Sequence, residues 1–99
     1  METQETLRTV LESVVRTLDA ESGAVFWGDD DHLELAHTLG AWTGETHLSV
    51  PLESQGLQVG RLSLSARRAG LAYTPLDREV LQQTANLVAR AVSLVRPPN

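Results

Sequence analysis

Apolar residues recur at helical spacing near both ends of the chain and alternate with polar residues in the region between. Residues 5–18 place their apolar side chains within an arc of about 140° on a helical wheel, which predicts an amphipathic helix. The apolar side chains that follow Thr74 occupy an arc of about 180°, which predicts a second and longer helix. The first stripe consists of Leu7, Val10, Leu11, Val14, Val15 and Leu18. The second consists of Leu76, Val80, Leu81, Ala85, Leu87, Val88, Ala91, Val92, Leu94 and Val95.

Capping residues mark the ends of both predicted helices. Thr3 is a suitable N-cap for the first helix, because its hydroxyl can accept a hydrogen bond from an unpaired backbone N–H group. Thr74 is the predicted N-cap of the last helix, with Pro75 at the first helical position and Asp77 three residues after the cap. The proline pair at 97–98 is expected to end that helix.

Four segments of alternating polarity predict β-strands, and short polar connections separate them. The predicted strands are residues 23–27, 33–38, 47–53 and 57–66. Polar connections at residues 29–32 and 54–56 join these strands in pairs, which predicts two hairpins. Residues 39–46 contain two glycines and are expected to form a loop.

The alternation sorts the strand residues onto two faces of the predicted sheet. One face would carry Leu33, Leu35, Leu48, Val50, Leu52, Leu62 and Leu64, with His37 on the same side. The other would carry Glu34, Ala36, Thr38, His47, Ser49, Pro51, Glu53, Arg61, Ser63 and Ser65. We therefore expect the first face to pack against the helices and the second to face water. Val59 breaks the alternation beside Gly60, which predicts a β-bulge there.

Several of these segments carry sequence motifs of a known family. They are Ser22-Gly23-Ala24-Val25-Phe26-Trp27, Val50-Pro51-Leu52, Gln58-Val59-Gly60-Arg61-Leu62-Ser63-Leu64 and Tyr73-Thr74-Pro75-Leu76-Asp77. In this order, and with an apolar helix after the last of them, they resemble the GAF domain, a small sensory module of many signalling proteins. The resemblance implies a single α+β domain over residues 1–99, with a four-stranded antiparallel sheet in the order 2-1-4-3. Both terminal helices are expected on one face of this sheet, and residues 23–27, apolar on both sides, near its centre.

The segment that usually builds the ligand pocket of a GAF domain is nearly absent. Residues 38–47 leave only a short loop for this purpose, and the sheet face that it would cover is predicted to be polar. We therefore expect a shortened domain without the usual pocket. The alternative is that another chain or a retained minor cavity covers this face.

The terminal helices have more apolar surface than one sheet face needs. Val80, Leu87 and Leu94 recur every seven residues, a spacing that is typical of coiled coils. GAF domains often dimerise through a bundle of their first and last helices, so the resemblance implies a homodimer that also involves Leu7 and Val10. The alternative is that the whole apolar arc packs within one chain.

Composition and charge exclude several classes of function. The chain has 99 residues, 41% of them hydrophobic, and a net charge of −5. All its basic residues are arginines and only Arg67 and Arg68 are adjacent, so we do not expect a nucleic-acid partner. No apolar run approaches the length that spans a membrane, and no signal peptide is recognised, which favours a cytoplasmic location without membrane association.

The chain contains no cysteine. This excludes disulfides, thiolate metal sites and cysteine nucleophiles. GAF proteins that attach bilins through a thioether, and those that reduce free methionine sulfoxide, both need cysteines. The resemblance therefore does not extend to these two activities.

Other residues with potential chemistry do not form a recognisable catalytic or metal site. His32, His37 and His47 lack a metal-ligand spacing and are not expected to converge. The acidic residues 29–31 lack the ligand pattern of a calcium loop and suit a solvated turn. Glu34 and Glu53 fall on the exposed sheet face, so they are poor candidates for acid–base catalysis. We expect no metal, no cofactor and no enzymatic activity.

The sequence therefore predicts a non-catalytic signalling module that dimerises through its helices and relays a signal to a partner or an attached domain. The alternative is a GAF-like sensor that retains a small ligand near Phe26, Trp27 and Trp42. Trp42 lies in the glycine-containing loop, where it either folds back onto the rim of the core or contacts a partner or ligand.

Overall fold

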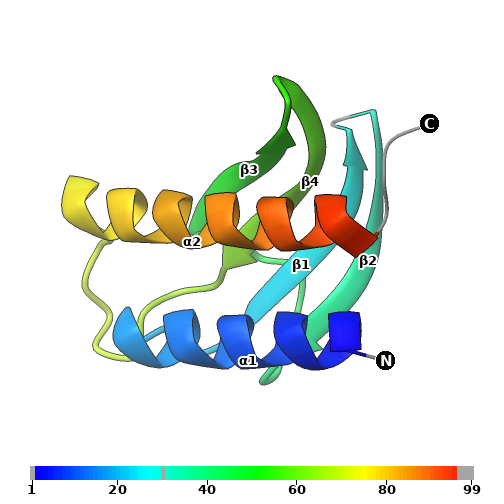
Figure 1. Cartoon of the computed structure of the whole chain (residues 1–99). Coiled ribbons are helices and arrows are strands. Elements are labelled where there is room, and N and C mark those ends of the chain that lie inside the picture. The colour runs from blue at the N-terminus through cyan, green and yellow to red at the C-terminus, as the bar shows by residue number, and fades with distance from the viewer. Residues whose placement is uncertain (1, 30, 96–99) are drawn as a thin grey trace.

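The computed structural model describes residues 2–29 and 31–95 and contains all six predicted elements (Figure 1). They are α1 (Glu2–Thr17), β1 (Gly23–Asp29), β2 (His32–Leu39), β3 (Leu48–Ser54), β4 (Leu57–Leu64) and α2 (Pro75–Val95). Their bounds differ from the predicted ones by at most three residues, as expected where helix ends and strand ends fray.

The strands form one antiparallel sheet in the order β2-β1-β4-β3, which confirms the predicted topology. Strand β1 is central, as its apolar residues on both sides indicated. Helices α1 and α2 lie side by side in opposite directions across one face of the sheet (Figure 1). We call this the helix side and the opposite face the reverse side.

The core lies between the helices and the helix side of the sheet. Strands β3 and β4 contribute Leu48, Val50, Leu52, Leu62 and Leu64, all buried as the alternation predicted. The helices contribute Leu7, Leu11, Val14, Val15, Leu81, Ala85, Val88 and Ala89, and Leu18 follows directly after α1. Each fully buried leucine or valine stabilises the fold by about 1.5–3 kcal/mol, so this layer is the main source of stability. Leu7 is only 1% exposed within the single chain, so it belongs to the core rather than to a surface that a partner could reach.

A β-bulge in β2 reverses the predicted facing of its first half. Val25 of β1 pairs with His37, but the next residue, Phe26, pairs with Leu35, so Ala36 is an extra residue in β2. His37 consequently shares the helix side with Val25, while Leu35 shares the reverse side with Phe26. Leu33 and Leu35 are 36% and 56% exposed, so the prediction that they join the core was wrong.

The second bulge is where the sequence predicted it. Leu52 pairs with Gly60 and Glu53 pairs with Gln58, so Val59 is the extra residue of β4. A side chain at Gly60 would collide with the backbone carbonyl oxygen of Phe26 in the neighbouring strand. Glycine is therefore required here by the close approach of two backbones.

Candidate functional site

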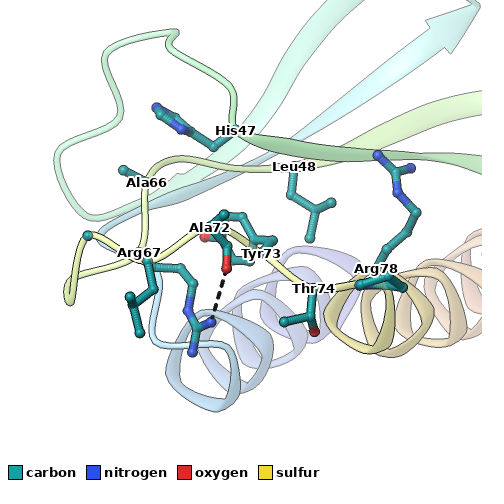
Figure 2. Close-up of a pocket in the computed structure, with 11 residues that line it drawn as sticks. His47, Leu48, Ala66, Arg67, Ala72, Tyr73, Thr74 and Arg78 are labelled. Atoms are coloured by element: carbon teal, nitrogen blue, oxygen red, sulfur yellow. Dashed lines mark hydrogen bonds between the residues drawn. The ribbon is translucent and has the colours of Figure 1, made fainter.

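A pocket of about 620 Å³ opens where the start of β3 meets the β4–α2 loop and the first turn of α2 (Figure 2). We call it the corner pocket. Its walls are formed by His47, Leu48, Ala66, Arg67, Gly70, Leu71, Ala72, Tyr73, Thr74, Pro75 and Arg78. A volume of this size lies within the range of about 300–1,000 Å³ that is common for ligand pockets. The pocket is on the helix side of the sheet, and its walls include none of Phe26, Trp27 and Trp42, the residues proposed from the sequence for a residual ligand.

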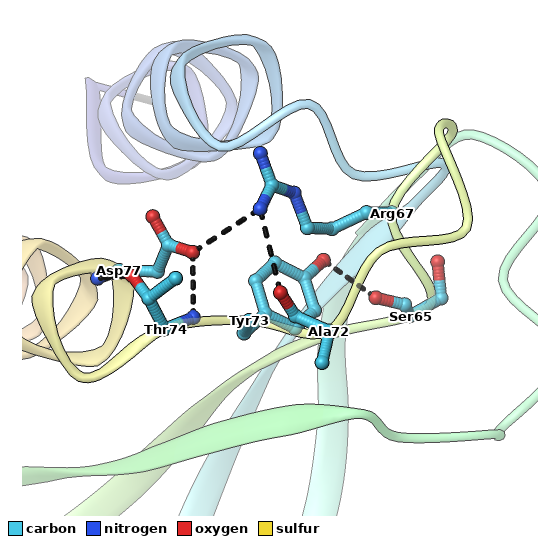
Figure 3. Close-up of polar contacts among 6 residues, drawn as sticks. All are labelled: Ser65, Arg67, Ala72, Tyr73, Thr74 and Asp77. Carbon is cyan, nitrogen blue, oxygen red and sulfur yellow. Dashed lines mark hydrogen bonds and ion pairs between the residues drawn. The ribbon is translucent and has the colours of Figure 1, made fainter.

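The first turn of α2 forms one wall, and its N-terminus is capped as the sequence predicted (Figure 3). The Asp77 N–H donates to Thr74 Oγ1 at 3.1 Å, and the Thr74 N–H donates to Asp77 Oδ2 at 2.8 Å. The hydrogen bond from the Thr74 backbone lowers the pKa of Asp77 below its ordinary value, and the Arg67 guanidinium adds to this effect. The carboxylate of Asp77 therefore already occupies the positive end of the helix.

Arg67 and Tyr73 tie the β4–α2 loop to this helix end. Arg67 Nη1 lies 3.4 Å from Asp77 Oδ2 and 3.5 Å from the Ala72 carbonyl oxygen, and its guanidinium stands 5.8 Å from the centre of the Tyr73 ring. The Tyr73 hydroxyl donates to the Ser65 carbonyl oxygen at 2.6 Å. Burial raises the pKa of Tyr73 to about 12, and the cation of Arg67 opposes that rise.

The basic side chains of the corner pocket are only loosely paired. Arg67 Nε is buried and has no hydrogen-bond partner among the residues that the structure describes. Arg78 donates from Nη1 to the Ser49 carbonyl oxygen at 3.3 Å, and His47 lies 3.5 Å from the carboxylate of Glu45. The walls of the pocket contain no aspartate or glutamate. The sequence interpretation did not find this pocket, because its residues come from three segments that only the fold brings together.

The three aromatic residues proposed as ligand contacts are divided between the two faces. Phe26 and Trp42 meet on the reverse side, with ring centres 6.3 Å apart and an interplanar angle of 66°. Trp27 lies on the helix side, where it packs against the core. The exposed side chains of Leu33 and Leu35 extend along β2 on the reverse side, so the β1–β2 half of this face is apolar rather than polar. We call Phe26, Leu33, Leu35 and Trp42 the reverse-side patch.

The other half of the reverse side is polar as the sequence predicted, but Ser63 and Ser65 on it are buried, at 3% and 8% exposed, rather than facing water. Ser49 and Ser63 hydrogen-bond through their hydroxyl groups at 3.0 Å, and Arg61 donates from Nε to Ser49 Oγ at 2.9 Å. These hydrogen bonds join β3 and β4, where side chains alternate between the two faces of the sheet as predicted.

The residues proposed for a dimer interface have different exposures. Leu87 on α2 is 61% exposed, whereas Val10 on α1 and Val80 on α2 are half-buried at the edge of the core. Leu7 is buried, as described above, and the side chain of Leu94 lies outside the described residues. Leu76, which is 67% exposed, lies on the same side of α2 as Leu87 and Val80 at about 100° per residue.

The described histidines lie apart from one another. His32 and His47 are exposed at opposite ends of the sheet, and His37 lies on the helix side of β2. Within residues 2–29 and 31–95, no cluster of three or more His, Asp or Glu side chains has the geometry to hold a metal ion. The helices in that same part of the chain are too short or too polar to span a membrane.

Comparison with known proteins shows the fold. No protein-family model matches the sequence, and no curated protein matches it. A crystal structure of a GAF domain/HD domain protein from Geobacter sulfurreducens is similar over 96% of this chain and 95% of that chain, with a TM-score of 0.80 and 10% sequence identity. The photoproduct state of GAF3 from a Synechocystis sp. PCC6803 protein is similar over 95% of each chain, with a TM-score of 0.79 and 14% identity. The chain therefore has the fold of GAF domains.

Proposed function

We propose that this chain is a non-catalytic signal-transduction module that self-associates through its terminal helices and relays a conformational signal to a partner or an attached domain. The fold supports this proposal, because both similar structures are of GAF-domain proteins and one of these proteins also has an HD domain. As part of the proposal, the module acts in the cytoplasm and binds neither nucleic acid nor membrane.

The exposed leucine on the outer surface of α2 is the observation that carries the proposal. Arg78 and Gln82 donate hydrogen bonds to backbone carbonyl groups of β3, so their side of α2 faces that strand. Leu87 and Val80 project from the opposite side of the helix. Burial of Leu87 against a second copy would contribute about 1.5–3 kcal/mol before the cost of association.

Light scattering coupled to size-exclusion chromatography tests the proposal. We expect the unmodified chain to be a dimer and Leu87→Glu to be a folded monomer, because the new carboxylate would be buried without a partner at the interface. Leu57→Glu is a matched control, since Leu57 is 68% exposed at the β3–β4 turn, and it should remain dimeric. A monomeric unmodified chain at high concentration would exclude self-association.

The contact between Phe26 and Trp42 favours a second candidate, a sensor that binds a small apolar ligand at the reverse-side patch. Because aromatic faces and exposed leucines meet there, an apolar ligand would exclude water from both. Intrinsic fluorescence titrated with a panel of metabolites tests this candidate. A response that Trp42→Phe abolishes would support it, since Trp27 would remain as the unaffected fluorophore on the other face.

A further inference from the structure

The corner pocket differs in charge from the molecule as a whole. The chain carries 13 acidic residues and 8 arginines, yet the pocket walls contain two of these arginines, one histidine and no carboxylate. In Figure 2 the side chains of His47 and Arg78 stand on either side of Leu48 at the β3 wall. A negatively charged ligand is therefore the one that complements this pocket.

The hydrogen-bonding capacity of the two arginines is not exhausted by the contacts that the structure describes. A charge-assisted hydrogen bond from a guanidinium to a carboxylate is typically about 2.7–2.9 Å long. The contacts of Arg67 are longer, at 3.4 and 3.5 Å, and Arg78 makes one contact of 3.3 Å to a neutral carbonyl group. Arg67 Nε is buried without a partner in the described structure and is out of reach of a ligand, whereas the side chain of Arg78 is exposed. The pocket can thus offer donors to a ligand.

The positive charge of the pocket that no acidic side chain balances indicates which class of anion would bind. Asp77 already balances Arg67 and caps the helix, and Glu45 lies beside His47, so Arg78 is the main cation without an acidic partner in this group. One net positive charge suits a monoanion better than a phosphate dianion. Leu48, Leu71 and Pro75 add apolar surface beside the polar groups of the walls. We propose that the corner pocket binds a small organic carboxylate with a short apolar chain, its carboxylate held by Arg78 and its apolar chain against these walls.

Such a ligand would bridge β3 and the first turn of α2, since the Arg78 side chain extends from α2 towards the start of β3. Binding would therefore act on the helix that the proposed function uses for self-association. The binding itself does not depend on that function, because Leu87 lies almost three turns further along α2.

Titration of the ¹⁵N-labelled chain with butyrate, followed by two-dimensional NMR, tests the proposal. We expect saturable shifts of the amide signals of residues 47–48 and 66–78, which sodium chloride at the same ionic strength does not produce. Arg78→Gln should weaken butyrate binding at least about tenfold, because it removes a charge-assisted hydrogen bond. Arg90→Gln is the matched control, as Arg90 is exposed on α2 outside the pocket, and it should bind as the unmodified chain does.

Three outcomes would overturn the proposal. They are the absence of saturable shifts with butyrate, shifts that chloride reproduces, and an equal loss of affinity in both arginine variants. Inorganic phosphate that binds at the same residues more tightly than butyrate would overturn the choice of a carboxylate. Leu87→Glu should bind butyrate unchanged, so failure of this proposal and failure of self-association can be told apart.

Discussion

Tyr73 is the only tyrosine of the chain, and its phenol reports directly on the packing of the β4–α2 loop. Burial raises its pKa from 10.0 to about 12, so the folded state favours the neutral hydroxyl that donates to Ser65. The stability that this adds is present below pH 10 and is lost as the pH rises through about 12. The chain has no lysine or cysteine that would titrate in the same interval.

We expect the ultraviolet absorbance of the phenolate to appear with a midpoint near pH 12 in the folded chain and near pH 10 in denaturant. Tyr73→Phe should cost about 1 kcal/mol at neutral pH through the lost hydrogen bond. Its stability should also change less than that of the unmodified chain between pH 10 and 12. A midpoint near pH 10 in the folded chain would show that the phenol is solvated.

The N-cap of α2 gives a second prediction for a single residue. Thr74→Ala should reduce the free energy of unfolding by about 1 kcal/mol, because the N–H of Asp77 loses its side-chain acceptor. Thr74→Ser keeps the hydroxyl and should retain most of the stability. Urea denaturation of the three proteins measures both effects. Equal stability of the alanine and serine variants would contradict the role of the cap.

The stability that the N-terminus of α2 contributes also depends on pH. The pKa of Asp77 is lowered in the folded state, so its contribution is present at neutral pH and is lost as the pH falls through the lowered pKa. Asp77→Asn should therefore be less stable than the unmodified chain at neutral pH. The difference should shrink progressively in acid, as measured by urea denaturation at several pH values. A difference that does not vary with pH would show that the carboxylate charge is not involved.

At the scale of elements, sequence periodicity was enough for the helices and the strands, and the resemblance to GAF domains supplied the strand order, but neither was enough for every strand face. Gly60 marks the bulge of β4 because only glycine allows the close approach to Phe26. Nothing marks the bulge at Ala36, since leucine and histidine keep alternating with other residues along β2. A bulge of this kind is set by pairing with β1, which a pattern within one strand does not contain.

Substitutions in the strands test the bulge of β2. Leu35→Thr should change the free energy of unfolding by about 0.5 kcal/mol or less, because Leu35 is 56% exposed on the reverse side. Leu62→Ala, at a fully buried position of β4, should cost about 2–5 kcal/mol through lost burial and a cavity. Chemical denaturation compares the two. A large loss of unfolding free energy in Leu35→Thr would mean that β2 pairs with β1 without the bulge, so that the Leu35 side chain points into the core.

At the scale of the whole molecule, the corner pocket shows why a sequence can predict a fold without predicting a pocket on it. The fold follows from repeated local patterns, each of which many residues support. The pocket depends instead on a few residues, among them His47, Arg67 and Arg78, which stand in a loop or at the end of a helix. No spacing motif relates them, because their proximity results from the crossing of β3 and the β4–α2 loop.

Self-association predicts a further property of the whole molecule, since a dimer that unfolds to two free chains is stabilised by mass action. We expect the thermal midpoint of the unmodified chain to rise by about 4 °C for each tenfold increase in concentration, given the unfolding entropy of two chains of this size. Leu87→Glu should show a midpoint independent of concentration, and Leu57→Glu should behave as the unmodified chain does. Differential scanning calorimetry over a wide concentration range measures all three. A constant midpoint for the unmodified chain would mean that the exposed leucine of α2 serves a contact other than one between two copies.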